Sequence, residues 1–270
     1  MAWDEVWERI FREREWGRYP QEDVVRFVAR SFYAAPDHAA VKILEIGCGP
    51  GSGTSWFIAR EGFSLTGIDA SPTAVDKARE RFAAEGLRGE FVLGPAERLP
   101  FPDASFDAVV ANFGIHHVER PERAIAQARR VLAPGGTFAF TFWAAPQQNT
   151  AWRLIFDAIA AHGRTDVPMP AGNDAHATPE NFSRLVAEAG VDARTLRCEL
   201  IERDWELPRE ADLVSVFETG TVRMATLLRG QGDALPAIRR HVAEGVRLYT
   251  RGEVIALPTR AWLVAATATG

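Results

Sequence analysis

The chain has 270 residues, of which 47% are hydrophobic, and a formal net charge of −5. This composition supports a packed core and argues against disorder, and the acidic balance without a basic cluster argues against a nucleic-acid partner. The sequence has no apolar run of the roughly 18 residues that a membrane span needs, no basic leader and two cysteines. We therefore expect no membrane insertion, no disulfide framework, no metal site and a cytoplasmic location.

Two amphipathic helices are predicted first, at 3–15 and 21–33, where apolar residues recur at helical spacing. The segment "REWGRYP" between them contains Trp16 and Tyr19. We expect residues 1–35 to form a helical lid in which these two aromatic side chains bind substrate. Packing within a helical hairpin would explain the same aromatic residues.

Strands and helices then alternate. Ser71 and Pro72 mark the start of one helix and Gly86 marks its end. Repeated βα units predict a parallel sheet with right-handed crossovers. The expected strands are 41–46, 63–69, 89–94, 106–112 and 137–143, and the expected helices are 54–60, 72–85 and 121–132, the last ended by the "APGG" segment.

The pattern changes after the fifth strand. We expect an insertion with one helix at 146–177, a helix at 178–190, a strand at 195–207, two helices at 209–251 and a last strand at 254–268. The fold predicted is α/β, a doubly wound, mostly parallel seven-stranded sheet with an antiparallel edge strand, within a single domain over 1–270. The segments 146–177 and 209–251 are interpreted as helical caps, although they could instead widen the core or form a homodimer interface.

A glycine-rich turn follows the first strand and raises the question of what approaches it. Gly47, Gly49 and Gly51 suit a ligand lying against the backbone, or alternatively a tight turn. Asp69 ends the second strand 22 residues after Gly47, which suits a carboxylate that binds ribose hydroxyls, or one that accompanies the Ser71 cap. The dinucleotide pattern G-x-G-x-x-G is not completed, which argues against a nicotinamide dehydrogenase.

The stretch from Glu45 to Gly51 reads acid-x-G-x-G-x-G, and with "GIDASP" and the segment 94–143 it resembles the class I S-adenosylmethionine-dependent methyltransferases. The resemblance covers about 41–143, expected to be the cofactor-binding core (41–144), and lies in the small-molecule branch, near the ubiquinone/menaquinone-biosynthesis C-methyltransferases. It implies S-adenosyl-L-methionine as cofactor and methyl transfer to a small, apolar or aromatic acceptor by in-line displacement.

The resemblance also implies site residues. The glycines would line the methionine and ribose, Asp69 would bind the ribose, and Asn112 would lie near the methionine amino group. Relatives often have Asp or Asn where this chain has Pro95. In this chain Glu97 or a backbone carbonyl would accept the hydrogen bond from the adenine amino group. The cofactor-binding set implied is Glu45, Gly47, Cys48, Gly49, Gly51, Asp69, Ala70, Ala96, Glu97 and Asn112.

Three further side chains are candidates for chemistry or for acceptor binding. His116 and His117 follow the fourth strand, where either could act as a catalytic base or could be a capping or packing residue. Trp143 ends the fifth strand, where it could line the acceptor pocket or belong to the core. Two other functions stay open: a cyclase or lyase that keeps the cofactor, and a non-catalytic cofactor-binding subunit.

Overall fold

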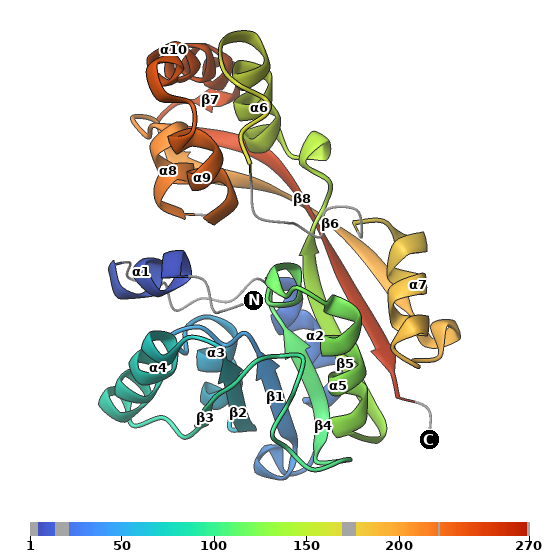
Figure 1. Cartoon of the computed structure of the whole chain (residues 1–270). Helices are drawn as coiled ribbons and strands as arrows, with labels where there is room; N and C mark the ends of the chain where they lie inside the picture. Colours follow the sequence, from blue (N-terminus) through green and yellow to red (C-terminus); the bar gives the residue numbers. More distant parts are fainter. Residues whose placement is uncertain (1–4, 14–21, 169–176, 221, 269–270) are drawn as a thin grey trace. The chain divides into compact units, whose positions relative to one another are not determined.

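The computed structural model describes residues 5–13, 22–168, 177–220 and 222–268 (Figure 1). The chain divides into two compact units. Unit 1 comprises Met1–Phe142, His176–Glu199 and Trp262–Gly270, and unit 2 comprises Trp143–Ala175 and Leu200–Ala261. The segments predicted as helical insertions, 146–177 and 209–251, thus lie almost wholly in unit 2.

The strands form one sheet in the order β3-β2-β1-β4-β5-β8-β6, and a short β7 pairs with β8. The pairs β1–β2, β1–β4, β2–β3 and β4–β5 are parallel. Backbone bonds join Gly136 to Ala268 and Ala144 to Arg260, so β8 runs antiparallel to β5. The predicted fold class is confirmed. The strands are β1 (Lys42–Ile46), β2 (Ser64–Asp69), β3 (Glu90–Leu93), β4 (Phe106–Ala111), β5 (Leu132–Trp143), β6 (Arg197–Pro208), β7 (Thr250–Arg251) and β8 (Val254–Thr267).

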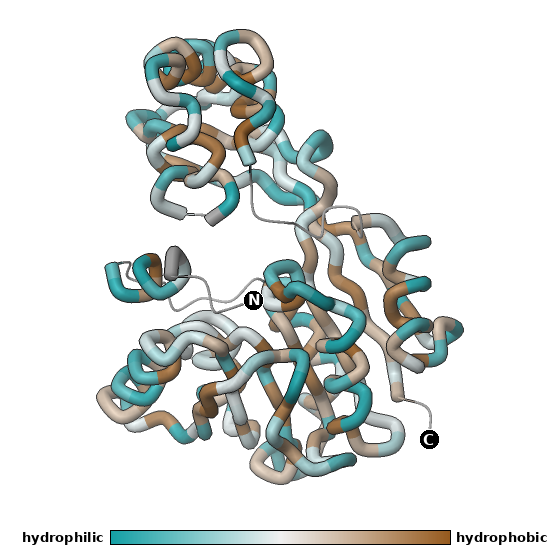
Figure 2. The backbone as a smooth tube through the Cα atoms, viewed as in Figure 1, coloured by the Kyte–Doolittle hydropathy of each residue, from teal (hydrophilic) through white to brown (hydrophobic). Residues whose placement is uncertain are grey.

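The core of unit 1 lies on both faces of the sheet. Alternate residues along β1 go to opposite faces: Ile43 packs with α2, α3 and α4, and Leu44 packs with α5 and α7. Hydrophobic residues, brown in Figure 2, therefore occur along the strands of the sheet. The helices of unit 1 are α1 (Glu5–Glu13), α2 (Glu22–Phe32), α3 (Thr54–Arg60), α4 (Pro72–Glu85), α5 (Pro121–Val131) and α7 (Pro179–Glu188).

Side-chain caps set the helix ends that position the loops. Ser71 accepts a hydrogen bond from the Ala74 N–H at the start of α4, and Gly86 ends α4 in the left-handed conformation with φ 65°. Thr178 caps α7 in the same way. Strand β5 begins at Leu132, five residues before the predicted start, because Leu132 pairs with Phe106 before an irregularity in the register.

Unit 2 is a helical layer packed around its own hydrophobic cluster. It contains α6 (Thr150–His162), α8 (Leu213–Gly220), α9 (Val222–Arg229) and α10 (Leu235–Val246). Within the described residues of 209–251 there are three α-helices, so the prediction of two was wrong. Leu213–Gly220 and Val222–Arg229 are two short helices that contact one another, and helical apolar spacing does not distinguish two short helices from one long helix.

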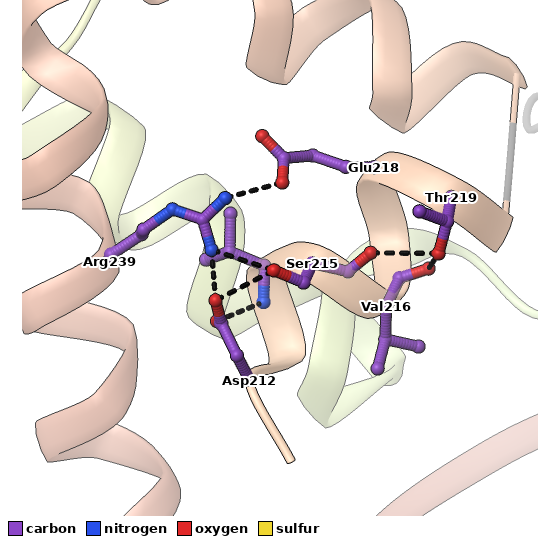
Figure 3. A network of polar contacts seen from close by, with 7 residues as sticks. Asp212, Ser215, Val216, Glu218, Thr219 and Arg239 are labelled. Atoms are coloured by element: carbon purple, nitrogen blue, oxygen red, sulfur yellow. Dashed lines mark hydrogen bonds and ion pairs between the residues drawn. The ribbon is translucent and has the colours of Figure 1, made fainter.

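A polar network joins α8 to α10 (Figure 3). Arg239 donates hydrogen bonds to Asp212, Glu218 and, at 3.0 Å, to the Ser215 hydroxyl. Asp212 also accepts from the Val214 N–H at 3.0 Å, which caps the first turn of α8. One guanidinium thereby orders two helices that are separated by α9 in the sequence.

Candidate cofactor and active site

The glycine-rich turn joins β1 to α3. Gly47, Gly49 and Gly51 have φ values of 72°, 53° and 66°, a region that side chains rarely adopt. A Cβ on Gly47 would lie 3.0 Å from the Gly114 Cα, and a Cβ on Gly51 would lie 2.9 Å from the Ala78 Cβ of α4. Close packing of the protein itself therefore requires glycine at both positions. Their contact with a cofactor stays a prediction.

Asp69, at the end of β2, reaches across to this turn. Its Oδ2 accepts a hydrogen bond from the Gly49 N–H and its Oδ1 accepts one from the Ser71 N–H, both at 2.9 Å. The side chain is 7% exposed. The geometry is therefore compatible with both roles predicted for Asp69, support of the Ser71 cap and binding of the ribose. Each carboxylate oxygen has a second lone pair that can accept a hydrogen bond from a ribose hydroxyl.

Burial controls the electrostatics of the turn. Burial raises the pKa of Asp69 to about 6, against the lowering effect of the backbone N–H groups of Ser71, Gly49 and Ala70. Burial likewise raises the pKa of Glu45 to about 8, although the Ser55 hydroxyl donates a hydrogen bond to this carboxyl. Two buried carboxyl groups on adjacent strands thus lie beneath the turn.

Cys48 lies inside the turn as a small buried residue. It is 4% exposed, and a Cβ added to Gly67 would meet its Sγ at 2.9 Å. Burial, followed by the charges of Asp69 and Glu45, raises the pKa of its thiol well above the usual value. This environment keeps the thiol protonated, and a protonated thiol is a poor nucleophile.

The residues predicted to bind the adenine and the methionine part of the cofactor follow β2, β3 and β4. After β3, Pro95 is exposed, Ala96 is buried and Glu97 is half-buried, as is Ala70 after β2. After β4, the Asn112 Oδ1 accepts a hydrogen bond from the Thr141 hydroxyl at 2.9 Å, and Thr141 in turn accepts from the Phe113 N–H at 2.8 Å. The carboxyl ends of β1 to β4 therefore bring the predicted cofactor residues to one edge of the sheet.

The two histidines differ in their surroundings. Both lie in the 3-10 turn η2 (Ile115–His117) after β4. His116 is buried and packs edge-on against Phe142 with ring centroids 4.6 Å apart. His117 is exposed, and its ring lies 4.8 Å from that of Trp7 in α1. His116 is therefore a core residue, whereas His117 lies at the edge of the sheet where the ligand is expected.

Helix α1 contributes side chains that sequence reasoning did not place at the site. Phe11 lies 3.5 Å from the position of a Cβ on Gly49, Glu8 accepts a hydrogen bond from the Ser71 hydroxyl, and Trp7 packs on His117. One helix thus touches the loops after β1, β2 and β4. The amphipathic pattern predicted the helix and an apolar face, but not its partners. Trp16 and Tyr19 lie outside the described residues.

Trp143 belongs to unit 2, where it packs with aromatic residues. Its ring lies 5.3 Å from that of Trp152 in α6, and Trp152 lies 6.3 Å from Trp205 and 5.0 Å from Phe217. The three tryptophans are half-buried and Phe217 is fully buried. These residues form the tryptophan cluster of unit 2, and a role for Trp143 in acceptor binding stays a prediction.

Residues 44–140 match the family described as methyltransferase domain. Over these residues the chain is similar to the class I S-adenosylmethionine-dependent methyltransferases. The matched residues span the sheet edge described above, from β1 to β5, which includes the glycine-rich turn, Asp69 and Asn112. S-Adenosyl-L-methionine is the methyl donor of this family.

Relatives with assigned activities differ in their acceptors. The chain is 39% identical over 110 residues to the fatty-acid O-methyltransferase of Mycolicibacterium smegmatis, which covers 40% of this chain and 39% of that protein. It is 29% identical over 182 residues to the demethylmenaquinone methyltransferase of Thermus thermophilus, which covers 63% of this chain and 83% of that protein. The chain spans less than half of the length of several curated relatives that it matches, the Mycolicibacterium protein among them.

Solved structures share the fold at low sequence identity. The YcgJ protein of Bacillus subtilis superposes with a TM-score of 0.57 at 18% identity, over 93% of this chain and 100% of that one. The [4+2]-cyclase SpnF superposes with a TM-score of 0.50 at 22% identity, over 96% and 86%. Among the described residues, no three potential metal-binding side chains come together, and no helix has the length and hydropathy to span a bilayer.

Proposed function

We propose that this protein transfers a methyl group from S-adenosylmethionine to a small apolar or aromatic molecule. The observation that carries the proposal is the buried carboxylate of Asp69 bonded to the N–H of Gly49, at adjacent strand ends within a methyltransferase domain. This arrangement offers hydrogen-bond acceptors for a ribose beside a turn in which three residues, Gly47, Gly49 and Gly51, have no side chain. A ligand of this kind suits the carboxyl ends of parallel strands.

Each site residue has a proposed task. Bound S-adenosylmethionine supplies an electrophilic methyl group on a sulfonium with a good leaving group. Asp69 accepts hydrogen bonds from the ribose hydroxyls, and Asn112, oriented by Thr141, binds the methionine amino group. Phe11 of α1 lies over the glycine-rich turn and Trp7 packs on His117, and we expect both rings to keep water away from the methyl group. Positioning of the acceptor then provides most of the rate enhancement, because no difficult leaving group must be activated.

His117 is the better placed of the two candidate bases. It is exposed at the ligand edge, whereas His116 is buried against Phe142. A neutral imidazole can accept a proton from a hydroxyl or an activated carbon acid. We propose that His117 is this base when the acceptor needs one, and that His116 supports the fold.

The tryptophan cluster of unit 2 supports an aromatic or lipophilic acceptor. The half-buried tryptophan rings have large apolar faces that suit an aromatic or lipophilic ligand. The names of two relatives, a fatty-acid and a demethylmenaquinone methyltransferase, point to lipophilic acceptors of different chemistry.

A transfer assay with labelled cofactor tests the proposal. The purified chain is incubated with S-adenosylmethionine carrying a labelled methyl group and, separately, with fatty acids, quinols and phenols. We expect label in an apolar product and, by calorimetry, binding of S-adenosylhomocysteine without binding of NAD. Binding of NAD alone would overturn the cofactor proposal. Turnover of an acceptor without gain of label would instead identify a cyclase or lyase that retains the cofactor.

A further inference from the structure

The segment after β3 is held by the last turn of α5 and not by regular structure of its own. The Arg130 Nη1 donates to the Phe101 carbonyl at 2.8 Å, and its Nη2 donates to the Leu99 carbonyl at 2.9 Å. Gln127, one turn earlier on α5, accepts from the Leu99 N–H at 3.2 Å and from Arg130 at 2.9 Å. Two side chains of one helix thereby hold three backbone groups of the segment.

Backbone hydrogen bonds extend this block. The N–H groups of Ala104 and Ser105 donate to the carbonyls of Arg130 and Val131 at 3.1 and 2.7 Å. These are carbonyls at the C-terminus of α5, which have no partner within the helix. At the other end, the Gly94 N–H donates to the Asp69 carbonyl at 2.9 Å. The segment 94–105 is therefore fixed between Asp69 and α5.

The guanidinium is suited to this task for a geometric reason. Its planar donors reach two carbonyls and one amide oxygen at the same time, which a lysine ammonium does not match. Arg130 also pairs with Asp103 at 2.7 Å, but the Asp103 side chain is 78% exposed. An exposed pair of this kind contributes little, so the carbonyl contacts are the ones that order the segment.

We propose that Arg130 is a positioning residue for cofactor selectivity: it holds the backbone around Ala96 and Glu97 so that this backbone reads the adenine amino group. This inference rests on the proposed function. Pro95 has no side-chain hydrogen-bonding group, so recognition falls to groups whose positions depend on the segment. Arg130 itself does not touch the cofactor.

Calorimetry with two ligands tests the inference. S-Adenosylhomocysteine carries the adenine amino group, and S-inosylhomocysteine carries a carbonyl in its place. We expect the full-length protein to prefer the adenine ligand by about tenfold or more, as for one buried hydrogen bond. In Arg130→Ala we expect binding of the adenine ligand to weaken by about tenfold, with binding of the inosine ligand changed less than about twofold. The ratio of the two affinities, adenine ligand to inosine ligand, then falls toward one.

Matched controls keep the test decisive. Asp103→Ala removes the exposed ion pair and leaves the carbonyl contacts, and Arg123→Ala removes an exposed arginine of the same helix; both are expected to keep the selectivity. If Arg130→Ala does not fold, Gln127→Ala replaces it in the test, because Gln127 contacts both Leu99 and Arg130. Equal losses for both ligands, unchanged binding of both, or no preference in the unmodified protein would overturn the inference. If the unmodified protein binds neither ligand, the proposed function fails as well.

Discussion

Asp69 accepts hydrogen bonds from two backbone N–H groups and is proposed to accept further ones from ribose hydroxyls. We expect Asp69→Ala to weaken binding of S-adenosylhomocysteine by about 2–4 kcal/mol, because charge-assisted hydrogen bonds contribute about 1.5–3 kcal/mol each and do not add fully. Calorimetry measures the change. Asp76→Ala, which removes an exposed carboxylate of α4 and leaves Asp69 in place, is the matched control. An unchanged dissociation constant for Asp69→Ala would leave Asp69 with a structural role alone.

Glu45 makes the stability of unit 1 depend on pH. Its pKa in the folded protein is about 8, above its ordinary value, so the folded state holds a proton that the unfolded state releases. The stabilising contribution is complete at low pH and is lost as the pH rises toward 8. Asp69, with a pKa of about 6, acts in the same direction but in a lower window.

Denaturant unfolding between about pH 6 and pH 8 therefore reports on Glu45. We expect the free energy of unfolding to fall by at most about 1.4 kcal/mol per pH unit in this range. Glu45→Gln, which cannot ionise and still offers an oxygen to Ser55, should flatten this dependence. A pH dependence that persists unchanged in the variant would assign it to another group.

Helix α1 is the element that covers the glycine-rich turn. Phe11 is 6% exposed and stacks on Trp7 with ring centroids 5.5 Å apart. We expect Phe11→Ala to loosen α1 and to speed release of S-adenosylhomocysteine by about tenfold or more, since truncation of a buried Phe costs several kcal/mol. Stopped-flow displacement measures the rate. Arg9→Ala, exposed on the same helix, should release ligand at the normal rate. Tighter binding in Phe11→Ala would mean that α1 obstructs the ligand.

The junction of α8 and α10 depends on Arg239. Its side chain is 32% exposed and contacts two carboxylates and a hydroxyl (Figure 3). We expect Arg239→Ala to cost about 1–3 kcal/mol, because the two carboxylates lose their shared donor. Hydrogen exchange should show faster exchange in α8 and α10. Arg240→Ala, at the exposed neighbouring position, is the control. Equal exchange in both variants would contradict a role for the network.

At the scale of the whole molecule, we expect the helical segments to respond to ligand. If 146–177 and 209–251 act as caps, binding of cofactor and acceptor should slow hydrogen exchange in these segments and around Tyr19. The physical reason is that a closed site excludes water from the methyl group. Slower exchange confined to the loops after β1 to β4 would exclude the cap and leave unit 2 with another task.

Much of unit 1 could be predicted from local signals. The alternation of apolar strands with capped helices predicted β1 to β4, and Ser71, Pro72 and Gly86 set the limits of α4 as expected. These signals act over a few residues, through backbone conformation and side-chain caps, so the sequence carries them directly. The same locality makes the acid-x-G-x-G-x-G turn and Asp69 visible as a candidate cofactor site.

Long-range packing determined the rest. Gly51 is required by Ala78 of α4, Phe11 reaches Gly49, and Arg130 holds the carbonyls of Leu99 and Phe101. Short sequence patterns do not predict these contacts, because each contact joins residues that are distant in sequence and come together only when the sheet forms. Local sequence patterns were sufficient to predict the fold class, the cofactor family and the candidate residues on the strand ends. The tertiary structure decided which side chains surround them, since burial and hydrogen-bond partners depend on the folded arrangement of the chain.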